Sequence, residues 1–251
     1  MGASRIEFRA RMLINATIIV VGFWAPWTAS RSAWAGLGPH VSLMEWLALH
    51  VSRLELLPFS AAAPVVIGAA ALCAAVGAVL RVWGSAYLGA GTVHSFHMQA
   101  GAVVAAGPYR FVRNPLYLGL WFMVAALAFL MPPSGALVAM AGITLFQLRL
   151  ILGEEAFLTQ RIGEPYLAYR RAAPRIVPRF RGALARAGQK PEWVRAVLTE
   201  LTPIGVFVAL AFCSWSYDNQ LMMRAILISF GLSLVMRAMP MGKTEQRASE
   251  A

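Results

Sequence analysis

The sequence predicts an all-α protein, a polytopic transmembrane helical bundle with about six spans and both termini cytoplasmic. Three observations lead to this prediction. Of the 251 residues, 59% are hydrophobic and 13% are charged, and the mean hydropathy is +0.63, which is not the balance of a water-soluble domain. Long apolar stretches recur along the chain, and basic residues gather on one side of them. We therefore expect a multi-pass integral membrane protein, in the cytoplasmic membrane if the source is bacterial.

Six apolar stretches are long enough to cross a hydrocarbon core of about 30 Å as helices. Each is bounded by Arg, Pro, Gly or a charged turn, as helix ends usually are. The predicted spans are residues 11–27, 61–83, 116–132, 134–152, 201–217 and 220–238. Only a short Pro- and Gly-containing turn separates the third span from the fourth, so these two should form an antiparallel hairpin. Residues 28–60 should contain an amphipathic segment, because Leu43, Trp46, Leu47 and His50 recur at helical spacing.

The distribution of charge predicts the orientation. The chain carries a net charge of +11 from 22 basic and 11 acidic residues. With the spans placed as above, 19 of the 22 basic residues fall on one side, which the positive-inside rule assigns to the cytoplasm. No basic run is interleaved with aromatic residues, so we expect no nucleic-acid partner. Residues 1–35 also resemble a signal peptide ending at Ala33-Trp34-Ala35, and cleavage of the N-terminus stays open.

Polar residues concentrate in two segments, 84–117 and 149–180. The predicted hairpin of the third and fourth spans brings the two segments together at the cytoplasmic surface. They supply histidine, tyrosine, arginine, asparagine and glutamate side chains in one place. This convergence predicts a polar pocket at the membrane interface.

Two motifs in these segments resemble those of the integral-membrane methyltransferases. They read GPYRFVRNPLYLG at 107–119 and EEAFLTQRIGEPYLAYRRAAPRIVPRF at 154–180. This superfamily includes isoprenylcysteine carboxyl methyltransferases and phospholipid N-methyltransferases. The resemblance implies S-adenosyl-L-methionine as cofactor and a lipidic or prenylated small molecule as methyl acceptor. The resemblance covers about 80–180, and together with the predicted spans it divides the chain into an N-terminal span with its amphipathic loop (1–60), a methyltransferase core with the cofactor site (61–183) and two additional C-terminal spans with a tail (184–251).

The resemblance assigns cofactor contacts to residues at the start of the third span. The side chains expected there also suit the cofactor, because it offers a carboxylate, an amine and hydroxyls to polar groups and a sulfonium to aromatic faces. The carboxyl methyltransferases usually have His where Asn114 stands, and an amide cannot act as a base near neutral pH. The expected cofactor-binding residues here are Tyr109, Arg113, Asn114, Pro115, Leu116 and Tyr117.

Two adjacent carboxylates, Glu154 and Glu155, follow the fourth span. The resemblance to the phospholipid enzymes assigns both to cofactor binding, whereas in the carboxyl methyltransferases the first Glu binds substrate together with an Arg one turn earlier. Leu150 stands at that earlier position, and Arg149 is one place away. A buried carboxylate here needs a partner such as Arg113 or Arg149. Glu155 and Arg149 are the predicted catalytic residues, and Glu154, Glu155 or a water would accept a proton from an amine acceptor.

The segment before the third span completes the predicted cofactor site. A GxG motif there resembles one that phospholipid N-methyltransferases place against the cofactor, and other residues match a cofactor-contacting stretch of the carboxyl methyltransferases. The expected contacts are Gly89, Gly91, His94, Gly101, Ala102, Val103 and Val104. His94 and His97 lack an evident third ligand, so we expect no metal. Farther along, Tyr166, Tyr169 and the neighbouring arginines should dock on lipid headgroups.

The favoured function is S-adenosylmethionine-dependent methyl transfer at the cytoplasmic membrane interface. Two alternatives stay open. Some sterol reductases share this helical architecture and use a nicotinamide cofactor, although no dedicated phosphate clamp is evident here. A non-enzymatic membrane scaffold is the other alternative, although polar residues are not spread through the spans as a transporter would need. The sequence leaves the acceptor's identity and the oligomeric state undetermined.

Overall fold

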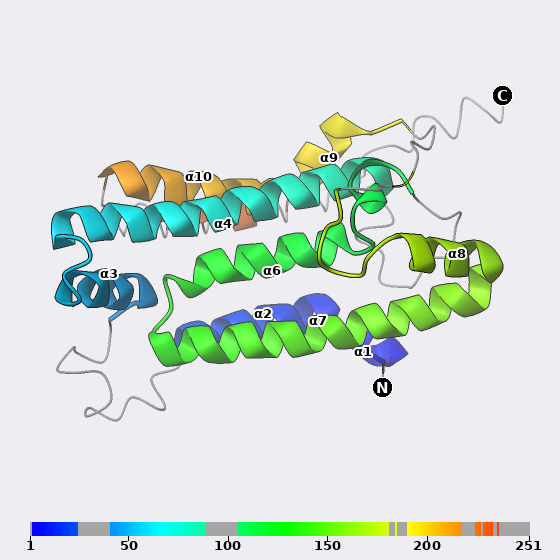
Figure 1. The fold of residues 1–251 in the computed structure, drawn as a ribbon, viewed down its shortest axis with the longest axis horizontal. Coiled ribbons are helices and arrows are strands. Elements are labelled where there is room, and N and C mark those ends of the chain that lie inside the picture. Colours follow the sequence, from blue (N-terminus) through cyan, green and yellow to red (C-terminus); the bar gives the residue numbers. More distant parts are fainter. Residues whose placement is uncertain are drawn as a thin grey trace.

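The computed structural model describes residues 2–24, 41–88, 105–180, 184, 190–216, 224–226, 228–232 and 235. Within these ranges all regular secondary structure is helical (Figure 1), which confirms the predicted all-α class. The elements in chain order are α1 (Arg5–Arg9), α2 (Arg11–Trp24), α3 (Leu43–Arg53), α4 (Phe59–Leu88), the 3₁₀ helix η1 (Gly107–Arg110), α6 (Pro115–Ala128), α7 (Pro133–Ile162), α8 (Glu164–Ala172), α9 (Trp193–Thr199) and α10 (Leu201–Ser216).

Two helices, α4 and α7, are long and apolar enough to cross a membrane. Helices α9 and α10 would add a third crossing if they act as one span, and they meet at an angle of 69°. Helices α2 and α6 are apolar but shorter. About half of the sixth predicted span, 220–238, lies outside the described residues. The count of six spans and the cytoplasmic orientation of the termini therefore stay predictions.

Helices α4 and α7 extend beyond their predicted spans. The predicted span 134–152 corresponds to a helix that runs to Ile162, and 61–83 corresponds to one that runs to Leu88. The prediction followed the apolar residues, whereas the helices continue through polar residues of good helix propensity such as Glu154, Glu155 and Gln160. These extensions carry the helices out of the apolar zone into the region where the polar segments lie.

The long helices form a layered bundle, with α4 and α10 on one side of α6 and with α7 and α2 on the other (Figure 1). Helices α6 and α7 form the predicted antiparallel hairpin. Small residues allow the close crossings, as is common between membrane helices. A Cβ atom on Gly77 of α4 would lie only 2.9 Å from the carbonyl oxygen of Gly119 in α6, and one on Gly135 of α7 would collide with the backbone of Gly22 in α2.

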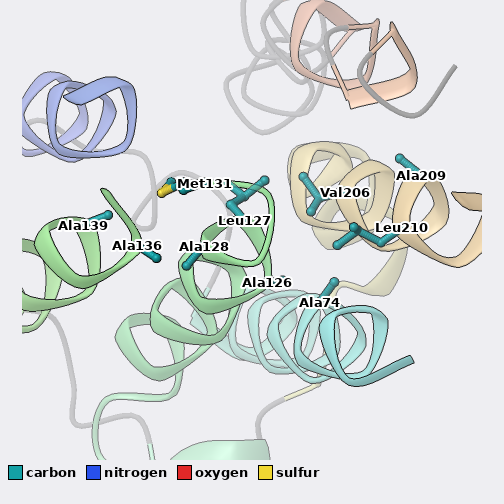
Figure 2. Close-up of a cluster of buried hydrophobic side chains, with 10 residues drawn as sticks. All are labelled: Ala74, Ala126, Leu127, Ala128, Met131, Ala136, Ala139, Val206, Ala209 and Leu210. Atoms are coloured by element: carbon teal, nitrogen blue, oxygen red, sulfur yellow. The ribbon is translucent and has the colours of Figure 1, made fainter. Parts of the chain in front are cut away.

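An apolar cluster fills the bundle near the α6–α7 turn (Figure 2). It joins α4, α6, α7 and α10, and its buried members are Ala74, Ala126, Leu127, Ala128, Met131, Ala136, Ala139, Val206, Ala209 and Leu210. Helix α3 closes this end, because Leu43 N–H donates to the carbonyl oxygen of Met131 at 2.7 Å. A capping box of Ser42 and Glu45 begins α3, which is the amphipathic segment predicted within 28–60.

At the opposite end, η1 and α8 lie near the C-terminal part of α7 and the start of α6, α1 lies beside α7, and α9 lies against the C-terminal part of α4 (Figure 1). Two glycines with positive φ make the turns there. Gly107, at φ +55°, begins η1 with its Cα against the ring of Tyr87, and Gly163, at φ +75°, separates α7 from α8. Both conformations suit a residue without a Cβ atom. These turns fold the polar segments back over the end of the bundle.

Candidate functional site

The two polar segments predicted to converge are joined by backbone hydrogen bonds. Arg113 N–H donates to the carbonyl oxygen of Pro174 at 2.8 Å, and Arg179 N–H donates to that of Phe111 at 2.9 Å. The loop that follows α8 therefore lies alongside residues 111–113, which precede α6. Because these bonds join main-chain groups, the segments are held in register independently of their side chains.

The carboxylate of Glu155 lies at the centre of a buried ionic cluster. Only 4% of Glu155 is exposed, and its Oε1 lies 3.2 Å from Nη2 of Arg113. Its Oε2 accepts from Nη2 of Arg175 at 2.9 Å, and its Oε1 also accepts from Nε of Arg175 at 3.2 Å. The hydrogen bond with Glu155 raises the pKa of the Arg175 guanidinium. Both carboxylate oxygens are thus engaged by guanidinium groups, as a buried anion requires.

Two further contacts fix the residues on either side of this cluster. Nδ2 of Asn114 donates to the carbonyl oxygen of Arg175 at 3.0 Å, and Nη1 of Arg113 donates to that of Arg170 at 2.9 Å. Asn114 is the residue before the first turn of α6, which begins with the buried Pro115. The amide therefore ties the helix start to the loop after α8.

Glu154 lies in a separate environment from Glu155. The hydroxyl of Tyr117, in the first turn of α6, donates to Oε2 of Glu154 at 3.0 Å. The guanidinium of Arg11, at the start of α2, is close enough to act electrostatically on both Tyr117 and Glu154. The two adjacent carboxylates thus face different partners, since Glu155 meets two arginines and Glu154 meets a phenol.

Tyr109 lies buried beside this site with its ring among α4 and α6. Its hydroxyl has no hydrogen-bond partner among the described residues, and a Cβ on Gly84 would lie 3.6 Å from it. Burial raises the pKa of Tyr109 well above its ordinary value, so the phenol stays protonated and remains a donor. Leu116, the second residue of α6, lies against the same Gly84.

The tyrosines of α8 are part of the core rather than a lipid-docking surface. Tyr166 and Tyr169 are 6% and 8% exposed, and the hydroxyl of Tyr169 donates to the carbonyl oxygen of Tyr109 at 2.9 Å. Burial raises the pKa of Tyr166 to about 12. The expectation that these two side chains dock on headgroups is wrong, because they pack with Ala173 instead.

The N-terminal helix α1 packs against α7 close to the site, because Phe8 is buried with Phe146 and Leu150 of α7. Arg149 Nη2 lies 2.9 Å from Oε1 of Glu7, and Ala3 N–H donates to the carbonyl oxygen of Arg149 at 2.8 Å. The side chain of Arg149 is 45% exposed. Of the predicted site residues, the structure brings together Tyr109, Arg113, Asn114, Pro115, Leu116, Tyr117, Glu154 and Glu155, and it directs Arg149 toward Glu7.

Seven predicted cofactor contacts fall in a segment that the structure leaves undescribed. These are Gly89, Gly91, His94, Gly101, Ala102, Val103 and Val104. Their role stays a prediction, as does that of His97. Within the described ranges, no group of three His, Cys, Asp or Glu side chains is arranged to hold a metal ion.

A cavity of about 200 Å³ lies between α6 and α7, next to the polar cluster. Its lining includes Gln147, which is 4% exposed and whose buried Nε2 has no partner in the described part of the chain. The sequence analysis missed Gln147, although an amide inside the apolar stretch 134–152 was a visible signal. The lining residues are Asn114, Tyr117, Leu118, Trp121, Thr144, Gln147, Leu148, Ile151 and Ile176.

A second buried ion pair, also missed, ties the C-terminal helices to α4. Glu200, at the α9–α10 bend, is 0% exposed and lies 2.6 Å from Nε of Arg81. The hydroxyl of Ser85 donates to the same carboxylate at 2.7 Å. The signal in the sequence was a carboxylate directly before the apolar run 201–217. Such a carboxylate needs a cation on the same side of the membrane.

Comparison with known proteins identifies the central part of the chain. Residues 65–164 match the phospholipid methyltransferase family. The matched segment contains most of α4, all of α6 and α7 and the first of the two motifs, and the match confirms the resemblance to membrane methyltransferases. No curated protein matches the chain, and no solved structure does.

Proposed function

We propose that this protein is an S-adenosylmethionine-dependent methyltransferase that acts on a lipid acceptor at the membrane interface. The family match over residues 65–164 is the observation that carries the proposal. The geometry supports it, because the matched segment holds Tyr117, Glu154 and Glu155 at one end of long apolar helices, beside a cavity. The match favours methyl transfer over the nicotinamide-dependent reductase and the scaffold.

The residues present fit such a cofactor. Two buried donors, the Tyr109 hydroxyl and Nε of Arg113, lack partners among the described residues, and a bound group is one explanation for buried polar atoms in this state. We assign cofactor contacts to the start of α6 and to the Glu154-Glu155 pair, together with the predicted loop residues. When bound, the cofactor would supply a methyl group on an electrophilic sulfonium. The protein's contribution would be alignment and exclusion of water.

The two glutamates have different proposed roles. Glu155 is a positioning residue, because both of its oxygens are engaged by Arg113 and Arg175. Glu154 has only a phenol as its hydrogen-bond donor in the described residues, and it is the better placed of the two to accept a proton from an amine acceptor. General bases of this kind contribute about 10²- to 10⁴-fold to rate.

The test is methyl transfer by the purified full-length protein in lipid nanodiscs. Isotopically labelled S-adenosylmethionine is added with total membrane lipid, and mass spectrometry identifies the lipid that gains the label. Glu154→Gln should lower the rate about 100-fold or more. Glu164→Gln is the matched control, because Glu164 is 71% exposed and should leave the rate unchanged. Absence of both labelled lipid and S-adenosylhomocysteine binding would contradict the proposal.

A further inference from the structure

The N-terminal segment, residues 2–11, packs closely against α7 although it lies outside the segment that matches the methyltransferase family. Ala3 N–H donates to the carbonyl oxygen of Arg149 at 2.8 Å. A Cβ atom on Gly153 would lie 2.9 Å from the carbonyl oxygen of Ala3, so the two backbones are in close contact there. Gly153 directly precedes Glu154. The segment is therefore held at the part of α7 that carries the proposed base.

Phe8 of α1 connects this segment to the hydrogen-bond donor of Glu154. Phe8 is 6% exposed and is buried with Phe146 and Leu150 of α7. Tyr117 packs against the same cluster. The hydroxyl of Tyr117 donates to Oε2 of Glu154 at 3.0 Å. Docking of α1 thus brings an aromatic ring next to the phenol that holds this carboxylate.

The guanidinium of Arg11, at the start of α2, is fixed on Phe8. Its Cζ lies 4.2 Å from the centroid of the Phe8 ring, and its Nη1 donates to the carbonyl oxygen of Phe8 at 3.1 Å. A guanidinium over an aromatic face is a favourable arrangement. From this place, Arg11 acts electrostatically on Tyr117 and Glu154. The docked segment therefore presents a cation to the phenol and the carboxylate.

A cation is what Glu154 requires in order to stay charged. Glu154 follows the predicted span 134–152, and burial raises the pKa of its carboxyl group, whereas the hydrogen bond from Tyr117 and the charge of Arg11 act in the opposite direction. A hydrogen bond from one neutral phenol does not compensate for the desolvation of a carboxylate. The two arginines of the buried ionic cluster are engaged by Glu155 instead.

The neighbouring elements add other titratable groups, but these do not replace Arg11. The groups of α4, α7, η1 and α8 that act electrostatically on Glu154 or on Arg11 are Arg81, Glu155, Tyr109 and Tyr166. Arg81 is the cation in this set, and its Nε lies 2.6 Å from the carboxylate of Glu200. Within the described part of the chain, the charge that favours ionised Glu154 therefore comes from Arg11.

We propose that Arg11 is a positioning residue whose guanidinium, held on Phe8 beside Glu154, keeps that carboxylate ionised at neutral pH. One consequence rests on the proposed function. An ammonium group of the acceptor gives one proton to the Glu154 carboxylate, and the nitrogen keeps the bonding electron pair as its lone pair. The charge state of Glu154 itself does not depend on that function.

The test is an infrared titration of the Glu154 carboxyl group, without methyl donor or acceptor. Full-length protein is purified in a maltoside detergent, and the carbonyl stretch of protonated Glu154 is assigned by its loss in Glu154→Gln. Arg11→Met removes the charge but keeps an apolar side chain that packs on an aromatic ring. The pH at which half of Glu154 is protonated should rise by about one pH unit or more, as loss of a nearby opposite charge does.

Two matched variants separate charge from structure. Arg11→Lys keeps the charge and should recover most of the wild-type midpoint. Arg9→Met makes the same change at an exposed position of α1 and should leave the midpoint unchanged. If Arg9→Met raises the midpoint as much as Arg11→Met does, or if Arg11→Lys raises it equally, the proposal is wrong. Circular dichroism establishes that each variant is folded.

The wild type provides a test that needs no variant. A Glu154 carboxyl group that is already protonated at neutral pH would overturn the proposal, and so would an unchanged midpoint in folded Arg11→Met. In a protein that transfers methyl groups, the acidic limb of the pH–rate profile should move upward with the midpoint in Arg11→Met. A raised midpoint in a protein that transfers none would support this inference while contradicting the proposed function.

Discussion

The two ends of the helical bundle are held together in different ways. The end at the α6–α7 turn is packed from small and branched apolar side chains such as Ala139, Val206 and Leu210. At the other end, buried charges pair across elements, with Glu155 between Arg113 and Arg175 and with Glu200 on Arg81. Removing part of an apolar side chain weakens the packing around it. Removing one partner of a buried ion pair leaves an unpaired charge inside the protein, which strongly destabilises the fold. The first end should therefore govern stability alone, and the second should govern stability and activity together.

The largest effect should come from Glu155→Ala. Removing this carboxylate leaves the guanidinium of Arg113, whose side chain is 8% exposed, buried without its anion. Breaking such a pair typically costs about 3–5 kcal/mol. Thermal unfolding in detergent should show a large loss of stability, and S-adenosylhomocysteine binding should weaken as well. Glu164→Ala, at an exposed ion pair, is the control. A variant as stable as wild type would show that the cluster holds nothing together.

Leu210→Ala should destabilise the apolar end by about 2–4 kcal/mol, as other buried Leu→Ala substitutions do. Leu210 is 0% exposed and packs in the cluster of Figure 2. Because the site lies at the other end, affinity for S-adenosylhomocysteine below the unfolding temperature should match that of the wild type. Isothermal titration of the folded variant measures this. A loss of affinity as large as that of Glu155→Ala would abolish the distinction between the ends.

Tyr117→Phe should have a smaller and more selective effect. It removes the hydroxyl that donates to Glu154 at 3.0 Å, a contact worth about 1 kcal/mol in ordinary cases and somewhat more to a charged acceptor. Methyl transfer should fall about tenfold while the unfolding temperature changes little. Initial rates and differential scanning fluorimetry on the same preparation separate the two. A stability loss without a rate change would make Tyr117 purely structural.

The smallest effect should be a pH-dependent release of the N-terminal helix. The hydrogen bond from the backbone of Ser4, aided by Arg149, lowers the pKa of Glu7 below 4.5. Because the pKa of Glu7 is lowered when α1 is docked, the ionised carboxylate stabilises docking at pH values above its ordinary pKa. This stabilisation is lost as the pH falls through the lowered pKa. A spin label on Ile6→Cys, in a background without other cysteines, should become more mobile in that range. Glu7→Gln should make the mobility independent of pH.

The candidate site was predictable where the sequence placed charge next to apolar spans. Glu155 had to find a cation, and Arg113 was one of two expected partners. Arg175 was expected only at headgroups, and its pairing with Glu155 depends on the loop after α8 folding back along Phe111 and Arg113. Arg149, the other expected partner of Glu155, instead pairs with Glu7, which is far away in the sequence. Gln147 was visible as a polar residue in a span, but its unsatisfied state and its cavity were not.

The sequence by itself determined that the chain is helical and apolar, that the third and fourth stretches form a hairpin, and that two polar segments meet at the end of that hairpin. These features follow from periodicity, hydropathy and the short turn at Met131 to Gly135, which act locally. The tertiary structure alone decided which charge pairs with which, that Glu154 and Glu155 face different partners, and that a cavity opens beside Gln147. Pairing and cavities depend on how helices cross and side chains pack, and those contacts join residues that no local pattern relates.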